Sequence, residues 1–254
     1  MALDRVTSHD GTRIYFRTVG SGRPVLIVPG TLAPPTAYEP LVQQLADSHR
    51  VVVMSRRGYG VSEAGPRPFR MDQHAQDVSA VLKALGDRAV VFGHSTGAIA
   101  TLNAMRISAG RVARLVLYEP PVALLGNALR PLLVECTRLL KAARPGDAIK
   151  AASTLCAVRS IDYSSMNLSP LAAGLRADLE CVVGMALMPG QWSDVTTPTW
   201  LIEGEVSGPE FADSVRTMRA LLPHARNVRL PGQAHYPHDL TPIAELISQY
   251  PETG

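Results

Sequence analysis

The sequence predicts an α/β protein in which a mostly parallel central sheet is covered by helices on both faces. Short apolar runs alternate along the chain with segments whose apolar residues recur at helical spacing. Parallel strands need long crossover connections, and these connections place helices on both faces of the sheet. A chain of 254 residues, with 46% hydrophobic and 19% charged residues, can bury such a core in one domain.

The predicted strands are short and apolar, and turn-forming residues follow several of them. They span residues 13–18, 25–28, 50–54, 89–92, 115–118, 199–202 and 227–230. Helices are predicted over residues 38–46, 71–85 and 97–107. In the helix at 71–85 the apolar residues share one face, which we expect to pack on the sheet, and Gly86 ends this helix.

Residues 121–197 break this alternation because they contain no clear strand. Helical patches within them span residues 129–142, 148–158 and 171–185. We therefore expect a core formed by residues 1–120 and 198–254, with a helical cap of residues 121–197 inserted between two core strands. The Leu, Val and Met side chains of the cap could line an apolar pocket or simply pack the cap onto the core.

The charged residues favour no large charged partner. The formal net charge is +3, and Arg56-Arg57 is too small a basic cluster for a nucleic-acid-binding stripe. We expect these two arginines to lie on the solvated surface. No run of about 18 apolar residues is present, and the first residues lack the apolar segment of a secretory signal. We therefore expect a cytoplasmic protein that acts on a small molecule, with no nucleic-acid or membrane partner.

The three cysteines match neither a disulfide framework nor a zinc site, because they are far apart and odd in number. Cys136, Cys156 and Cys181 are predicted to pack in apolar surroundings. The sequence contains no glycine-rich phosphate loop, no clustered metal ligands and no dinucleotide fingerprint, so no cofactor and no metal are expected. The oligomeric state cannot be inferred from these patterns.

The pentapeptide GHSTG at residues 93–97 is the strongest functional signal. It follows a predicted buried strand and precedes a predicted helix, which is the context of a nucleophile elbow. The serine backbone of such a turn is strained, and Gly93 and Gly97 avoid clashes two positions to either side of Ser95. The turn raises the hydroxyl above the sheet edge, where the start of a helix favours negative charge. Ser95 is the candidate nucleophile, and an ordinary strand-to-helix turn is the alternative.

Further motifs extend this signal over nearly the whole chain. They are DGT at residues 10–12, PGT at 29–31, RGYGVS at 57–62 and GQAHYP at 232–237. Together with the serine pentapeptide, they resemble the α/β-hydrolase superfamily. The resemblance implies the α/β-hydrolase fold and a serine nucleophile, but it leaves the substrate open.

The resemblance also implies a general base in the loop after the last strand, where His235 lies. A serine hydroxyl is a weak nucleophile until a base accepts its proton. His94 competes for this role, but within the elbow it is expected to point away from the serine proton. Three further histidines have no motif around them and are expected on the surface: His74, His224 and His238.

The oxyanion formed in acyl transfer needs hydrogen-bond donors, usually backbone N–H groups. Thr96, the residue after the serine, is predicted to supply one of them. The loop after the second predicted strand is predicted to supply the other, from Thr31 or from its neighbour Leu32. The superfamily usually has His-Gly in this loop, whereas this chain has Pro29-Gly30, so the histidine that braces the loop is missing.

The acid partner of the histidine is displaced from its usual position in the superfamily. The usual Gly-x-x-Asp after the penultimate strand reads GEVS here, so Ser207 stands where the acid is expected. Certain lactonases and haloalkane dehalogenases carry the acid at the end of the strand after the nucleophile helix, where this chain has Glu119. Glu119 is the candidate acid; the alternatives are a cap-hinge residue paired with an arginine, or a Ser–His dyad. Glu205 and Glu210 lie before and after the usual position, and Asp239 is predicted to cap a helix.

These residues predict a serine hydrolase that cleaves an ester, lactone or thioester of a mostly hydrophobic small molecule. Ser95, His235 and Glu119 would carry the reaction through an acyl-enzyme, and Leu32 and Tyr236 are the candidate substrate-binding residues. The alternatives are a non-hydrolytic enzyme of the same fold, performing cyclisation or carbon–carbon bond chemistry in natural-product metabolism, and a non-enzymatic small-molecule binder.

Overall fold

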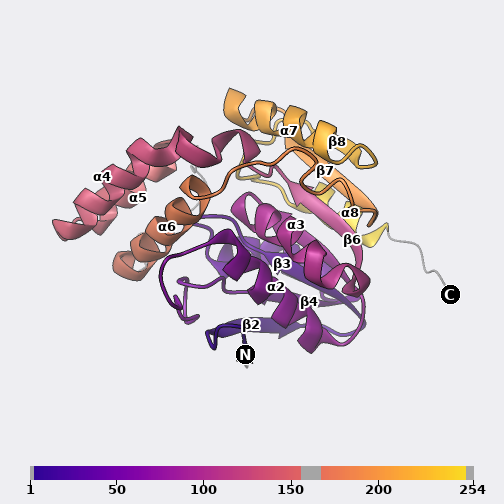
Figure 1. Ribbon diagram of the computed structural model, residues 1–254. Coiled ribbons are helices and arrows are strands. Elements are labelled where there is room, and N and C mark those ends of the chain that lie inside the picture. Colours follow the sequence, from indigo (N-terminus) through magenta and orange to yellow (C-terminus); the bar gives the residue numbers. More distant parts are fainter. Residues whose placement is uncertain (1–2, 156–166, 250–254) are drawn as a thin grey trace.

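The computed structural model describes residues 3–155 and 167–249, and its centre is a sheet of eight strands (Figure 1). The strand order is β1-β2-β4-β3-β5-β6-β7-β8. β1 and β2 pair antiparallel with each other, β2 pairs antiparallel with β4, and the remaining neighbours are parallel. The strands are β1 Leu3–Thr7, β2 Arg13–Val19, β3 Arg23–Val28, β4 His49–Met54, β5 Ala89–His94, β6 Val112–Tyr118, β7 Thr199–Gly204 and β8 Arg226–Leu230.

Helices cover both faces of this sheet. They are α1 Glu39–Leu45, α2 Met71–Leu85, α3 Thr96–Ser108, α4 Arg130–Lys141, α5 Pro145–Leu155, α6 Leu168–Val183, α7 Pro209–Leu221 and α8 Thr241–Ser248. Side chains of α2, α3 and α7 belong to one buried cluster, and those of α1 and α8 belong to a second. Along β5, Val91 enters the first cluster while Val90 and Phe92 enter the second, because successive strand side chains point to opposite faces. The predicted α/β fold with a mostly parallel sheet is confirmed.

Every strand predicted from the sequence is present, and the helix predicted at 71–85 is α2. The prediction gave no range for β1, α7 or α8, although Asp239 was expected to cap a helix where α8 begins. β1 is an exposed edge strand, so it carries no buried apolar run. The two helices each have proline in the first turn, a signal that could have revealed them. In α7, Phe211 and Val215 also show the four-residue spacing of a buried helix face.

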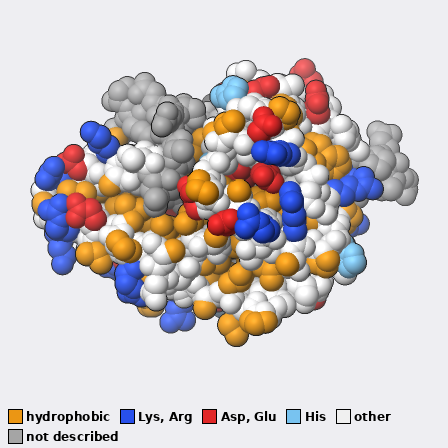
Figure 2. All heavy atoms as spheres, turned by 90° about the horizontal axis from the view of Figure 1, so that it is seen from above, with side chains coloured by type: hydrophobic (Ala, Val, Ile, Leu, Met, Phe, Trp, Pro, Cys, Tyr) orange, Lys and Arg blue, Asp and Glu red, His pale blue; other side chains and the backbone are white. Residues whose placement is uncertain are grey.

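In the described residues between β6 and β7, the α-helices α4, α5 and α6 pack against one another at one side of the molecule (Figure 1). α4 and α6 correspond to the patches predicted at 129–142 and 171–185, and α5 begins three residues before the patch predicted at 148–158. Residues 156–158 lie outside the described residues. Charged side chains gather at the outer end of these helices (Figure 2, left). The division of the chain into a core and a cap stays a prediction.

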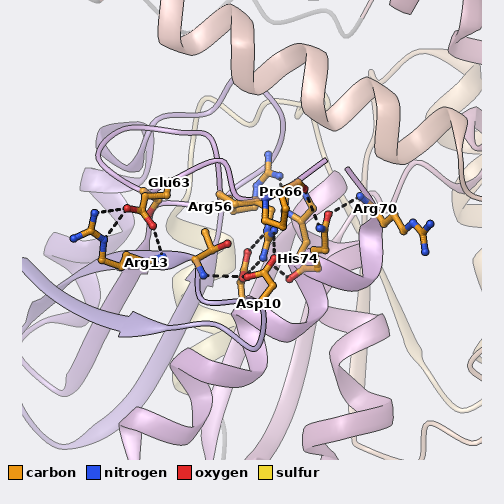
Figure 3. A network of polar contacts seen from close by, with 12 residues as sticks. Asp10, Arg13, Arg56, Glu63, Pro66, Arg70 and His74 are labelled. Carbon is orange, nitrogen blue, oxygen red and sulfur yellow. Dashed lines mark hydrogen bonds and ion pairs between the residues drawn. The ribbon is translucent and has the colours of Figure 1, made fainter. Parts of the chain in front are cut away.

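The prediction that Arg56 and Arg57 lie on the solvated surface is wrong, because both are buried and ion-paired. Arg57 Nε lies 2.7 Å from an Asp77 carboxylate oxygen on α2. Arg56 Nη2 lies 2.7 Å from an Asp178 carboxylate oxygen on α6. His74, also predicted on the surface, is buried on the inner face of α2, with Nδ1 3.5 Å from Arg56 Nη1 (Figure 3).

Cys136 and Cys181 are free and buried, as predicted, and Cys156 lies outside the described residues. Burial raises the pKa of the Cys136 thiol to about 11, so this thiol is protonated at neutral pH. Within residues 3–155 and 167–249, no helix has the length and apolar character needed to cross a bilayer.

Candidate active site

Ser95 occupies the sharp turn between β5 and α3. Its backbone has φ 54° and ψ −125°, a strained conformation for a residue with a side chain. A Cβ atom on Gly93 would lie 2.7 Å from the Cα atom of Ala98, and one on Gly97 would lie 2.2 Å from the carbonyl oxygen of Val28. The turn therefore requires glycine at both positions, as the pentapeptide predicts.

His235 lies in the loop between β8 and α8 and is buried. Its Nε2 atom lies 2.9 Å from Ser95 Oγ. The Phe211 ring of α7 stacks on the imidazole, with ring centroids 3.6 Å apart and planes inclined by 15°. The stacking fixes the plane of the ring, so the structure holds the candidate base against the candidate nucleophile.

Glu119 is the first residue after β6, and its carboxylate is directed at His235. Glu119 Oε2 lies 2.8 Å from His235 Nδ1, while Oε1 accepts a hydrogen bond from the Gly204 N–H at 2.7 Å. The neighbouring strand β7 ends at Gly204, so the carboxyl ends of two adjacent parallel strands meet at this carboxylate. The structure therefore brings together the three candidate catalytic residues that were predicted from the sequence: Ser95, His235 and Glu119.

The other acidic residues considered from the sequence have different partners. Glu205 Oε2 accepts a hydrogen bond from the Gly232 N–H at 2.9 Å. Asp239 Oδ1 accepts one from the Thr241 N–H at 2.9 Å, at the first residue of α8, where it satisfies a helix donor. Glu210 lies in the first turn of α7. Among the described residues, none of the three is hydrogen-bonded to His235.

The charge states around His235 follow from burial. Burial lowers the pKa of His235 to about 3, so the imidazole is neutral at neutral pH. Burial raises the pKa of Glu119, while the Ser207 side chain and the Gly204 N–H act in the opposite direction. With the carboxylate beside Nδ1, we assign the ring proton to Nδ1, which leaves the Nε2 lone pair facing the Ser95 hydroxyl. This arrangement can accept a proton from the serine.

Thr31 and Thr96 lie beside Ser95 and line the same pocket. Their Oγ1 atoms are 2.9 Å apart, and the Tyr236 hydroxyl donates a hydrogen bond to the Thr31 carbonyl. Within the described part of the chain, neither threonine N–H donates to another residue. An oxyanion hole needs two such uncommitted N–H groups, and both threonines line the pocket at Ser95.

The structure does not support the prediction that Leu32 binds substrate. Leu32 is completely buried in the core and lies outside the pocket lining. Its backbone is in the left-handed region, with φ 62°, and its N–H donates to the Tyr59 hydroxyl at 3.4 Å, so this N–H is not an uncommitted donor. Tyr236, the other predicted substrate-binding residue, does line the pocket.

A largely apolar pocket opens at Ser95 and His235. Most of its apolar lining comes from the segment after β6 and from the inserted helices: Leu124, Leu129, Leu132, Leu175, Leu179 and Val182. Asp178 is the one ionised side chain that contributes to the described lining. Among residues 3–155 and 167–249, no group of three His, Cys, Asp or Glu residues could hold a metal ion.

Asp178 and its partner Arg56 are site residues that sequence reasoning missed. Arg56 donates to both carboxylate oxygens of Asp178, each at 2.7 Å, and both side chains are buried. A buried carboxylate needs such a partner, because an unpaired charge is costly away from water. One signal was present in the sequence: Asp178 continues the apolar stripe of α6 that contains Leu171, Leu175 and Val182.

A second buried chain of hydrogen bonds runs behind the serine. The Gly30 N–H donates to the Tyr38 hydroxyl at 3.1 Å, and this hydroxyl lies 2.7 Å from His94 Nδ1. His94 Nε2 lies 2.8 Å from the carbonyl oxygen of His235, which can only accept, so Nε2 carries the ring proton. Tyr38 and His94 therefore brace the loop in which the superfamily's usual histidine is missing, and His94 points away from the serine proton as predicted.

The sheet, the strained serine turn and the hydrogen-bonded Ser–His–carboxylate arrangement define an enzyme of the α/β-hydrolase class. The chain belongs to the alpha/beta hydrolase family, whose model matches residues 25–249.

Characterised relatives agree with this membership. The chain is 25% identical to the 2-(acetamidomethylene)succinate hydrolase of Mesorhizobium japonicum, over 97% of this chain and 96% of that protein. It is 38% identical to a non-heme haloperoxidase of Rhodococcus erythropolis, over 51% of this chain and 46% of that protein. The solved structure of an alpha/beta hydrolase from Sphaerobacter thermophilus DSM 20745 matches with a TM-score of 0.75 and 26% identity, covering 96% of this chain and 98% of that one. The family and these relatives support hydrolase activity.

Proposed function

We propose that this protein is a serine hydrolase that cleaves an ester, lactone or thioester through an acyl-enzyme on Ser95. The observation that carries the proposal is the continuous hydrogen-bonded path from Ser95 Oγ to His235 Nε2, at 2.9 Å, and from His235 Nδ1 to Glu119 Oε2, at 2.8 Å. A neutral imidazole between a serine and a carboxylate is the arrangement that activates a hydroxyl for attack on a carbonyl carbon.

In the proposed mechanism, Ser95 Oγ forms a bond to the carbonyl carbon while its proton moves to His235 Nε2. The carbonyl electron pair moves onto oxygen, and the N–H groups of Thr31 and Thr96 stabilise the resulting oxyanion. When the oxyanion collapses, the leaving group departs with the proton from the imidazolium. A water molecule then attacks the acyl-enzyme by the same steps, releases the acid and restores Ser95. Glu119 orients the imidazole and stabilises its charged form.

The pocket supports a neutral, mostly hydrophobic acyl group. Leucine side chains dominate the described lining, and the Asp178 charge is compensated by Arg56, so the lining described offers no free cation to a carboxylate on the substrate. The succinate hydrolase relative is named for an acidic substrate, and the pocket here favours a less polar one. A p-nitrophenyl ester of a short, unbranched fatty acid is therefore a suitable first substrate.

The assignment of Ser95 is tested with a fluorophosphonate probe, which labels activated serines. We expect the probe to label the wild-type protein at Ser95 and to leave the Ser95→Ala variant unlabelled. We also expect the wild type to turn over p-nitrophenyl butyrate many times per enzyme. A folded wild type without labelling would contradict the nucleophile assignment. Labelling without repeated turnover would favour the non-hydrolytic alternative.

A further inference from the structure

Asp178 in the inserted helices is hydrogen-bonded to the loop that carries Thr31. The Thr31 hydroxyl donates to Asp178 Oδ2 at 2.8 Å. The same oxygen accepts a hydrogen bond from the Tyr59 hydroxyl at 2.7 Å, and Tyr59 in turn accepts the Leu32 N–H at 3.4 Å. Asp178 therefore holds two consecutive residues of this loop, one directly and one through Tyr59.

The direction of each hydrogen bond around Thr31 is determined. A hydroxyl carries one hydrogen, and the ionised carboxylate of Asp178 can only accept. The Thr31 hydroxyl therefore donates its hydrogen to Asp178. The Thr96 hydroxyl, 2.9 Å away, must then donate to Thr31 Oγ1. Burial opposes ionisation of Asp178, but the charge and hydrogen bonds of Arg56 lower the pKa of its carboxyl below the usual value.

This chain of hydroxyls joins the two residues whose N–H groups face the oxyanion in the proposed mechanism. The Thr31 carbonyl accepts from Tyr236, and its hydroxyl is committed to Asp178 and Thr96. The following residue, Leu32, has φ 62°, a conformation that persists only where its surroundings hold it. Asp178 and Tyr59, which are hydrogen-bonded to each other, supply that restraint through Thr31 and Leu32.

We propose that Asp178 is a positioning residue that couples docking of helix α6 to assembly of the oxyanion hole, through the hydrogen-bonded chain Thr96–Thr31–Asp178. This inference rests on the proposed function, because it assumes an oxyanion between the Thr31 and Thr96 N–H groups. When α6 is docked, the two N–H groups are held at one separation; when it moves away, Thr31 loses its restraint. The inserted helices thereby contribute to the rate of the chemical step as well as to the pocket.

The test removes the Thr31 hydroxyl and keeps its N–H. Asp178→Asn is the obvious variant, but it leaves Arg56 without its full partner and can prevent folding. Thr31→Val has nearly the same shape as the wild type and leaves the Arg56–Asp178 pair intact. We expect Thr31→Val to lower kcat for p-nitrophenyl butyrate by about tenfold or more with little change in KM, because the loss falls on the transition state. Thr31→Ser, which restores the hydroxyl, is expected to recover most of the activity.

A second readout separates positioning from a merely structural role. A trifluoromethyl ketone adds to Ser95 and forms an oxyanion, whereas the matching carbinol binds without addition. We expect Thr31→Val to weaken binding of the ketone by about the factor by which it lowers kcat/KM, and to leave carbinol binding unchanged. Thr137→Val, which removes a hydroxyl bonded within α4 at 2.7 Å, is the control and is expected to match the wild type in both measurements.

The outcomes distinguish this inference from the proposed function. An active wild type with a fully active Thr31→Val variant would overturn the role of the hydroxyl chain and leave the serine mechanism intact. Equal weakening of ketone and carbinol binding would show a general disturbance of the pocket and would also overturn the positioning role. A wild type that neither hydrolyses the ester nor binds the ketone would overturn the proposed function and this inference together.

Discussion

The carboxylate of Glu119 reaches the histidine because its own backbone is strained. Glu119 has φ 44°, in the left-handed region, where an ordinary residue is disfavoured by about 1 kcal/mol or more. Its N–H donates to the Ile202 carbonyl at 3.0 Å and its Oε1 accepts from the Gly204 N–H, so strand β7 holds both ends of the residue. The turn aims the side chain across the strand ends at His235, instead of along the strand.

We predict that Glu119→Gln lowers kcat by about 10³- to 10⁴-fold while the protein stays folded. An amide N–H facing His235 Nδ1 can donate a hydrogen bond to it, which favours the ring form with its proton on Nε2. In that form Nε2 cannot accept the serine proton. Glu205→Gln is the matched control, because Glu205 bonds to the Gly232 N–H and not to the histidine. The check is steady-state hydrolysis of p-nitrophenyl butyrate with circular dichroism of each variant. A larger loss in Glu205→Gln would place the acid on the neighbouring strand.

Local motifs account for the site residues that the sequence revealed. Ser95 and His235 stand in short patterns, and Glu119 followed from the resemblance once serine was found at the usual acid position. Arg56 carried no such pattern, because its partner Asp178 lies 122 residues further along the chain. Pairing over that separation depends on how α6 docks, which local spacing does not encode, so two adjacent arginines were interpreted as surface residues.

Among the elements, the buried strands were predicted from their apolar runs, whereas β1, α7 and α8 were given no range. β5 is apolar on both faces because the sheet is covered on both sides, and it was predicted from the sequence. β1 is an exposed edge strand and carries no buried apolar run, whereas α8 is short but does place Ile243 and Ile247 on one buried face. The existence of the inserted helices was predicted, but their arrangement over Ser95 depends on side-chain packing that no period specifies.

The 3-10 turn η1, Pro35–Tyr38, is tied to the end of β5 by one hydroxyl, and we predict the effect of removing it. Tyr38→Phe leaves the Gly30 N–H and His94 Nδ1 buried without a partner. We expect a loss of about 1–3 kcal/mol in the free energy of unfolding and a lower kcat, since Gly30 precedes Thr31 in the loop. Urea denaturation and ester hydrolysis measure the two effects.

The control for this element is Tyr15→Phe, which removes a hydroxyl from a half-buried position on β2, outside the Gly30–Tyr38–His94 chain. We expect it to change stability by less than about 0.5 kcal/mol. Equal stabilities and activities for the two variants would contradict the role of Tyr38 as a brace that substitutes for the missing histidine.

At the scale of the whole molecule, three buried histidines determine how the fold responds to acid. Burial lowers the pKa of His74, His94 and His235 to about 3 in each case, from an ordinary value of 6.5. The charge of Arg56 acts in the same direction on His74, and the neighbouring His235 does so on His94. The folded protein therefore keeps these rings neutral, while the unfolded chain protonates them below pH 6.5.

The sign of the pH dependence follows from these shifts. Between pH 6.5 and about 3 the unfolded chain binds more protons than the folded protein, so stability falls as the pH is lowered through this window. Three such groups give an upper limit of about 4 kcal/mol lost per pH unit once the pH is well below 6.5. Glu119 and Asp77 oppose this loss of stability. Burial raises the pKa values of their carboxyls, so as the pH falls the folded protein binds these protons before the unfolded chain does.

We predict that the free energy of unfolding, measured by urea denaturation, is nearly constant from pH 7.5 to 7 and falls steeply between pH 6 and pH 5. His74→Gln isolates one contributor, since His74 lies beside Arg56 and contacts neither Ser95 nor His235 in the described structure. This variant should lower the change of the unfolding free energy with pH by about 1.4 kcal/mol per pH unit, which is the value for one proton. A wild type whose stability did not change between pH 6 and pH 5, with the same result for His74→Gln, would contradict the prediction that the rings stay neutral in the folded protein. In that case His235 could not serve as the neutral base at these pH values, so the stability measurement also tests the protonation state that the proposed mechanism requires.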